Sequence, residues 1–156
     1  MANESATKSL RHKENSITKR NMKRVTGIGG IFFKTKDPEK LKQWYSTHLG
    51  IKTDKYGANF DWRKPDGTKR FTVWSTFKED TKYFQPSVKE MMINYKVENL
   101  EELLKILKEE GVTVVSEMEV YDYGKFGWIL DPEGNKIELW EPVDTEFEKM
   151  DTNTST

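Results

Sequence analysis

Residues 126–142 read FGWILDPEGNKIELWEP, and this stretch decides the fold. Apolar and polar side chains alternate on both sides of its centre, which predicts two strands over residues 125–131 and 135–142. The intervening Asp, Pro, Gly and Asn residues are favoured in tight turns, so the two strands should form a hairpin. Residues 65–69, PDGTK, match residues 132–136, PEGNK. The hairpin signal therefore occurs twice in the chain.

Further elements repeat around these two hairpins. GIGGIFFKT at 27–35 and MMINYKV at 91–97 are strand candidates, and a helix start follows each, at Asp37-Pro38 and at Asn99. More strands are expected over residues 52–63, 69–77 and 112–124. Each half then follows the order β-α-β-β-β. An internal repeat of this kind predicts an α+β fold made of two βαβββ modules.

Composition excludes several classes of protein. The chain has 156 residues, with 26 Lys and Arg against 26 Asp and Glu, so its formal net charge is zero. A strongly basic nucleic-acid-binding protein is therefore excluded as a description of the whole chain. The absence of Cys removes disulfides and thiolate metal sites, and it fits a reducing, cytoplasmic location. Because no apolar run approaches the roughly 18 residues of a membrane span, we expect neither a membrane nor a nucleic-acid partner.

Charge also marks the expected limits of the domain. Residues 1–24 carry seven Lys and Arg against two acids, a net of +5, without sustained periodicity, so they are predicted to be a disordered basic leader. Residues 144–156 form an acidic polar tail. Between them lies the folded domain, 25–143, which divides into module one at 26–77, a linker at 78–89 and module two at 90–142.

The opening GGIFFKTKDPEKLKQWYSTHLGI at 29–51 and the closing stretch at 126–142 closely resemble the vicinal oxygen chelate superfamily. That group includes glyoxalase I, extradiol dioxygenases and bleomycin-resistance proteins. The resemblance implies that the two modules form a cupped mixed sheet, the glyoxalase/bleomycin-resistance fold. It also implies metal ligands on the first and last strand of each module. The bleomycin-resistance proteins of this group imply, by analogy, a homodimer.

In this chain the family's ligand positions fall on Gly30, Met92 and Glu138, and matching residues 71–74 with 137–140, with one extra residue allowed in the first half, gives Thr72 as the fourth. Glycine has no side chain, and a thioether is a poor ligand for Zn²⁺, Mg²⁺, Mn²⁺ or Fe²⁺. One carboxylate cannot hold a catalytic divalent ion that normally takes three protein ligands. The sequence therefore predicts no metal and no other cofactor, in contrast to most of the superfamily.

The cup is instead expected to hold a small organic molecule. Alternation along the strands, together with the Trp residues of the intervening strands and a loop at the rim, gives these expected ligand-binding side chains: Phe32, Lys34, Trp62, Trp74, Met92, Asn94, Tyr123, Trp128 and Trp140. Many aromatic rings with few polar groups are the usual composition of such a site. Alternatively, Trp74 and Trp140 could fill the cup as core. Glu138 is the candidate catalytic residue, as general acid or base; it could equally contact a ligand or pair with Lys34 or Lys96.

The function predicted first is a metal-independent, glyoxalase/bleomycin-resistance-like protein that binds a small molecule between its modules. The alternative is a lyase, isomerase or dioxygenase-type enzyme of the same superfamily, either metal-dependent or using Glu138 as acid or base. A third interpretation is an interaction module that acts through its basic leader. The amino-acid sequence alone does not choose among these three functions.

Overall fold

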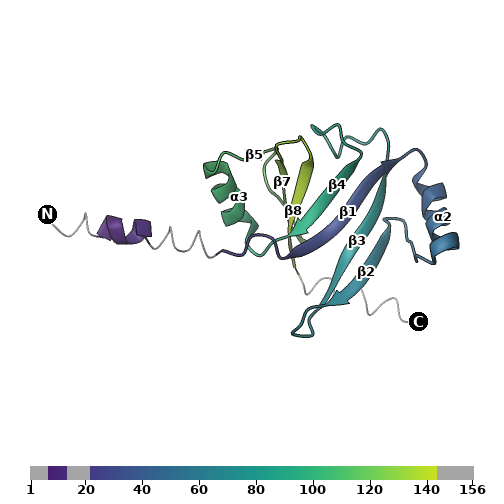
Figure 1. Ribbon diagram of the computed structural model, residues 1–156, viewed down its shortest axis with the longest axis horizontal. Helices are drawn as coiled ribbons and strands as arrows, with labels where there is room; N and C mark the ends of the chain where they lie inside the picture. Colours follow the sequence, from purple (N-terminus) through teal and green to yellow (C-terminus); the bar gives the residue numbers. More distant parts are fainter. Residues whose placement is uncertain (1–6, 14–21, 144–156) are drawn as a thin grey trace.

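An eight-stranded mixed sheet runs through the computed structural model, which describes residues 7–13 and 22–143 (Figure 1). Along the sheet the strands follow the order β2-β3-β1-β4-β8-β7-β5, and β6 pairs with β7. The strands are β1 (Gly27–Thr35), β2 (Ala58–Arg63), β3 (Lys69–Lys78), β4 (Met91–Lys96), β5 (Thr113–Val114), β6 (Glu119–Tyr121), β7 (Gly124–Leu130) and β8 (Lys136–Pro142). The labelled helices are α2 (Pro38–Leu49) and α3 (Leu100–Glu109).

The two predicted modules lie side by side within one chain. Strand β3 pairs parallel with β1, and β8 pairs parallel with β4, so each module places its last strand beside its first. Strands β1 and β4 then pair antiparallel and join the modules into one sheet. In Figure 1, α2 and α3 lie at opposite ends of this sheet. The α+β, two-module fold is thus confirmed, and both modules share one sheet of a single chain.

Module one contains fewer strands than predicted, because residues 52–57 form an irregular loop before β2. The carboxylate of Asp54 accepts the backbone N–H groups of Tyr56 at 2.7 Å and Gly57 at 2.9 Å. Such local bonds offer the backbone an alternative to a sheet ladder. The described part of module one is therefore βαββ. In module two, the predicted strand at 112–124 divides into β5 and β6.

Helix α3 packs as its apolar spacing predicts. Its buried side chains meet Leu139 of β8 and Val97, which directly follows β4, in one core cluster that contains Val97, Leu100, Leu103, Leu104 and Leu139. Gly127 of β7 makes this close packing possible, because a Cβ there would lie 2.8 Å from Leu104 Cδ1. Both predicted N-caps are formed: Asn99 accepts the N–H of Glu102, and Asp37 accepts that of Lys40.

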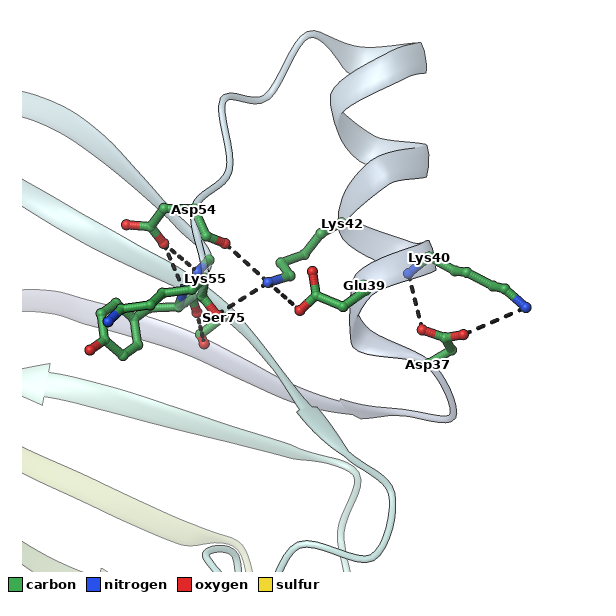
Figure 2. Close-up of polar contacts among 9 residues, drawn as sticks. Asp37, Glu39, Lys40, Lys42, Asp54, Lys55 and Ser75 are labelled. Atoms are coloured by element: carbon green, nitrogen blue, oxygen red, sulfur yellow. Dashed lines mark hydrogen bonds and ion pairs between the residues drawn. The ribbon is translucent and has the colours of Figure 1, made fainter. Parts of the chain in front are cut away.

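The buried side chain of Lys42 connects helix α2 to the loop before β2 (Figure 2). Lys42 is its one buried residue. The ammonium donates to the carbonyls of Asp54 at 3.0 Å and Lys55 at 3.2 Å, and it pairs with Glu39 at 2.8 Å. These bonds tie the loop before β2 to the helix. A buried ammonium needs such partners, since desolvating it alone would be costly.

Beyond the sheet, residues 7–13 form a short helix in which every residue is exposed. The sequence predicted no regular structure there, but the segment contains Lys, Leu and Arg, which favour helices. The other leader residues, 1–6 and 14–21, and the acidic tail at 144–156 lie outside the described residues. Within residues 7–13 and 22–143, no helix has the length and apolar character needed to span a membrane.

Candidate functional site

The candidate site lies on the face of the sheet opposite helix α3, here called the cup face. Phe32 pairs with Met92 across β1 and β4, while Asn94 pairs with Glu138 across β4 and β8. Glu138 in turn pairs with Trp128 of β7. Partners across a ladder point to the same side of a sheet, and so do residues two apart along one strand. The structure therefore brings these five predicted residues together.

Glu138 lies at the centre of this group and is 2% exposed. Its Oε1 accepts a hydrogen bond from Asn94 Nδ2 at 2.6 Å, and its Oε2 accepts one from Trp128 Nε1 at 2.8 Å. The hydroxyl of Tyr83 donates to the same Oε2. A buried carboxylate is tolerated only when polar partners replace its lost hydration. Three donors from three separate segments supply that compensation here.

Two aromatic residues of the predicted linker also occupy the cup face. Phe84 is completely buried, and it packs in a core cluster with Phe32, Met92 and Trp128. Its neighbour Tyr83 stacks on Phe77 of β3, with ring centroids 5.5 Å apart and planes at 6°. The sequence predicted only a linker at 78–89, and neither residue was expected in the site. The available signal was the pair of adjacent aromatic rings in an otherwise polar segment, because solvated linkers seldom carry them.

A second group of rings surrounds Lys96, which is 4% exposed. The Lys96 ammonium lies 4.5 Å from the ring centroid of Phe71, 5.1 Å from that of Trp140 and 5.8 Å from that of Trp62. It also donates to the carbonyl of Phe71 at 2.5 Å. Phe126 stacks on Trp140 with centroids 5.8 Å apart. The predicted residues Trp62 and Trp140 thus meet around a buried cation.

The remaining predicted residues of the cup lie at its edges. Tyr123 is 42% exposed and stacks on Tyr121, with centroids 5.3 Å apart. Lys34 places its ammonium 5.5 Å from the ring centroid of Phe84. It also lines a surface hollow of about 520 Å³ together with residues from 79–88. Both side chains are therefore positioned at a rim rather than in the buried centre.

Desolvation shifts the pKa values of two side chains near Glu138, those of Tyr83 and Lys136. Burial, reinforced by the neighbouring Glu138 carboxylate, raises the pKa of Tyr83 well above its usual value. Desolvation lowers the pKa of Lys136, whose ammonium donates to the carbonyl of Tyr83 at 2.7 Å. Within the described ranges, neither Lys34 nor Lys96 forms an ion pair with Glu138. The structural ion pair that the sequence left open is therefore not present among them.

Trp74 does not face the cup, so its predicted place in the site is wrong. It pairs with Ile31 on the opposite side of the sheet. Its ring contacts Phe33, with centroids 5.4 Å apart, and Tyr45 of α2, with centroids 4.8 Å apart. Matching residues 71–74 with residues 137–140 of the repeat displaced β3 by three residues, because Ser75 rather than Thr72 is the counterpart of Glu138. Such a slip turns every side chain of a strand to the other face.

The same slip makes Thr72 wrong as the counterpart of Glu138. Phe32 lies two residues after Gly30, as Asn94 lies two residues after Met92 in the repeat. Asn94 pairs with Glu138, whereas Phe32 pairs with Ser75. Ser75 therefore occupies the fourth family position.

A difference in hairpin length explains why the alignment failed. Six residues separate Lys69, the first residue of β3, from Ser75. Only two separate Lys136, the first residue of β8, from Glu138. Each arm of the β2–β3 hairpin is therefore four residues longer than that of the β7–β8 hairpin, and Figure 1 shows it extending beyond the neighbouring strands. The one extra residue allowed in the first half reduced this displacement from four residues to three, which is an odd number. Matching the two turns could not reveal this, because turn sequence carries no information on strand length.

The four family positions do not make a set of ligands for a divalent cation. Gly30 lacks a side chain and Met92 offers a soft thioether. The Ser75 hydroxyl donates to the carbonyl of Tyr56 at 2.5 Å, and both oxygens of Glu138 accept hydrogen bonds. In the part of the chain that the structure describes, no three His, Cys, Asp or Glu residues are grouped to bind a metal. No step of the chemistry below depends on one.

Comparison with known proteins identifies the family. A family model described as "Glyoxalase-like domain" matches residues 30–140. The chain belongs to this family, as the motifs at 29–51 and 126–142 indicated. The comparison with curated proteins found no match.

Solved structures share the fold at low sequence identity. A methylmalonyl-CoA epimerase from Mycobacterium tuberculosis is 19% identical, with a TM-score of 0.52 over 83% of this chain and 99% of that one. A Streptomyces coelicolor methylmalonyl-CoA epimerase in complex with 2-nitronate-propionyl-CoA is 15% identical, with a TM-score of 0.56 over 76% and 99%. A hypothetical protein from Bacillus halodurans is 17% identical, with a TM-score of 0.50 over 73% and 92%. These likenesses establish the fold alone.

Proposed function

We propose that this protein binds a small organic molecule on its cup face and does so without a divalent metal. The observation that carries the proposal is the environment of Glu138. A catalytic metal needs further ligands beside this carboxylate, but the other family positions hold Gly30, Ser75 and Met92, and Glu138 instead accepts hydrogen bonds from Asn94, Trp128 and Tyr83. Such a carboxylate suits recognition of a hydrogen-bond donor on an organic ligand.

The surroundings of Glu138 favour an apolar or aromatic ligand. Phe77, Phe84 and Trp128 supply ring surfaces around the carboxylate, and Lys136 places its ammonium 5.3 Å from the Trp128 centroid. Small-molecule sites typically combine such ring surfaces with a few fixed polar groups. Because β1 and β4 pair within one chain, each chain should provide one complete site. A homodimer, as expected by analogy, would then be compatible with the site but not needed to build it.

Two measurements test the proposal. Elemental analysis of purified full-length protein should find no stoichiometric Mn, Fe, Co, Ni or Zn. A screen of aromatic and apolar molecules should yield ligands that raise Tm and change Trp fluorescence. The fluorescence change should largely disappear in Trp128→Phe and persist in Trp44→Phe, because Trp44 lies on α2 and is 51% exposed. A stoichiometric metal that is lost in Glu138→Gln would refute the proposal.

A second function, proton-transfer catalysis, is favoured by one contact. The Tyr83 hydroxyl and the Glu138 carboxylate are hydrogen-bonded, so an acid and a potential base lie together. Any carbonyl compound from the screen can be incubated with the protein in D₂O. Deuterium incorporation that is lost in Glu138→Gln, while binding persists, would favour an enzyme. Binding without exchange would favour the binding protein.

A further inference from the structure

We infer that the pocket around Glu138 recognises a phenol or a similarly hydroxylated planar ring, and that Tyr83 is its intramolecular occupant. The inference rests on the proposed function, because it names the ligand class of that same site. Tyr83 itself presents a phenol to the Glu138 carboxylate. A ligand with the same ring and hydroxyl group would therefore find matched partners once Tyr83 has moved away.

The contacts of Tyr83 define a slot for a flat ring. Phe77 stacks against one face of the ring, with planes at 6° and centroids 5.5 Å apart. Trp128 meets it edge to face, at 86° and 6.3 Å. The Lys136 ammonium lies 5.3 Å from the Tyr83 centroid. Stacking, edge contact and a cation over the ring are each favourable for aromatic rings in particular.

Of the three donors to Glu138, Tyr83 is the one that can leave. Asn94 and Trp128 belong to central strands and are 1% and 4% exposed. Tyr83 is 37% exposed and lies in the segment between β3 and β4, which contains neither helix nor strand. Phe84, its neighbour, is completely buried and can anchor this segment while Tyr83 moves. Rotation of Tyr83 would uncover the slot without opening the core.

The carboxylate makes the slot selective for a hydroxyl group. With Tyr83 displaced, Glu138 keeps its bonds from Asn94 and Trp128, so the buried charge stays compensated. Oε2 then has room for one more donor, which a phenol supplies and a hydrocarbon ring does not. A ring of the same size without a hydroxyl should therefore bind more weakly.

The test uses the full-length Tyr83→Ala variant with p-cresol and toluene as probes. We expect p-cresol to bind the variant and to raise its Tm by roughly 4 °C at a concentration about ten times its Kd. Toluene should bind at least about tenfold more weakly, the loss expected for a missing hydrogen bond to a charged group. In the double variant with Glu138→Gln, the preference for p-cresol should shrink. Equal binding of the two probes, or none by folded Tyr83→Ala, would overturn the inference.

Tyr83→Phe provides a second test that keeps the ring in place. Wild-type protein must break the Tyr83–Glu138 hydrogen bond to admit a ligand, whereas this variant does not, so its closed state is weaker. We expect p-cresol to bind Tyr83→Phe roughly tenfold more tightly than wild type, followed by Trp fluorescence. Equal affinities would contradict the role of Tyr83 as occupant. They would leave the proposed binding function to be decided by the wild-type screen and the metal analysis.

Discussion

Tyr83→Phe should destabilise the protein at neutral pH and have little effect at high pH. The change removes one hydroxyl that donates to a buried carboxylate and leaves the stacking on Phe77 in place. A hydrogen bond to a charged group is worth about 1.5–3 kcal/mol. Because Tyr83 is 37% exposed, solvent screens the contact and the lower part of the range applies. We expect a loss of about 1–2 kcal/mol in the free energy of unfolding at pH 7.

The pH dependence follows from the direction of the pKa shift. Burial and the Glu138 carboxylate raise the pKa of Tyr83 in the folded state above the usual tyrosine value of 10.0. The stabilising contribution of Tyr83 is therefore complete below pH 10, and it is lost as pH rises toward the folded-state pKa, because the unfolded chain ionises first. The loss is at most about 1.4 kcal/mol by pH 11, from 1.36 kcal/mol per pH unit, and solvent screening of the 37% exposed side chain reduces it. Wild type and Tyr83→Phe should then be nearly equal in stability.

The assay is urea unfolding of both proteins at pH 7, 9, 10 and 11, monitored by far-UV circular dichroism. Comparing the two at each pH cancels the titration of all other Tyr and Lys residues. Tyr123→Phe is the matched control, since that ring has a similar exposure, 42%, but stacks on Tyr121 instead of donating to Glu138. A stability difference between wild type and Tyr83→Phe that stays constant from pH 7 to 11 would refute the argument.

Three further predictions concern packing and hydrogen bonds within the fold. Phe84→Ala should lower the free energy of unfolding, measured with urea, by about 3–5 kcal/mol, because the ring is completely buried. Val88→Ala is the control, and it should change this free energy very little because Val88 is 85% exposed. Gly29→Ala should lower Tm markedly, since its Cβ would lie 2.0 Å from Asn94 Oδ1; an unchanged Tm would show that Asn94 is not fixed there. Lys42→Met should cost about 1–3 kcal/mol by leaving two carbonyls without their donor, and retained stability would mean that these bonds are dispensable.

Much of the fold could be predicted because its signals are local. The helix caps at Asp37 and Asn99, the hairpin turns and the apolar spacing of α3 each depend on residues close together in sequence. The resemblance of two motifs to the superfamily then predicted how the two modules are arranged in a cupped sheet. Strand alternation correctly placed Phe32, Met92, Asn94 and Glu138 on one face, since the period of a strand fixes its faces once its register is known.

The wrong or missing predictions concern residues whose positions depend on strand register or on contacts between segments far apart in the sequence. Trp74 and Thr72 were misplaced because nothing in the turn sequences reveals that one hairpin is longer. Tyr83 and Phe84 were missed because their segment has no regular structure, so no periodicity marks them. Their burial depends on strands that come from both modules.

By itself, therefore, the sequence determined a repeated α+β module, the scarcity of metal ligands and the face of the sheet on which Glu138 lies. Only the tertiary structure decided that β1 and β4 join both modules into one sheet within a single chain, and that Glu138 is enclosed by Asn94, Trp128 and Tyr83. The physical reason is distance along the chain. Caps, turns and alternation act between near neighbours, whereas the environment of a buried carboxylate is assembled from segments 10 to 55 residues away.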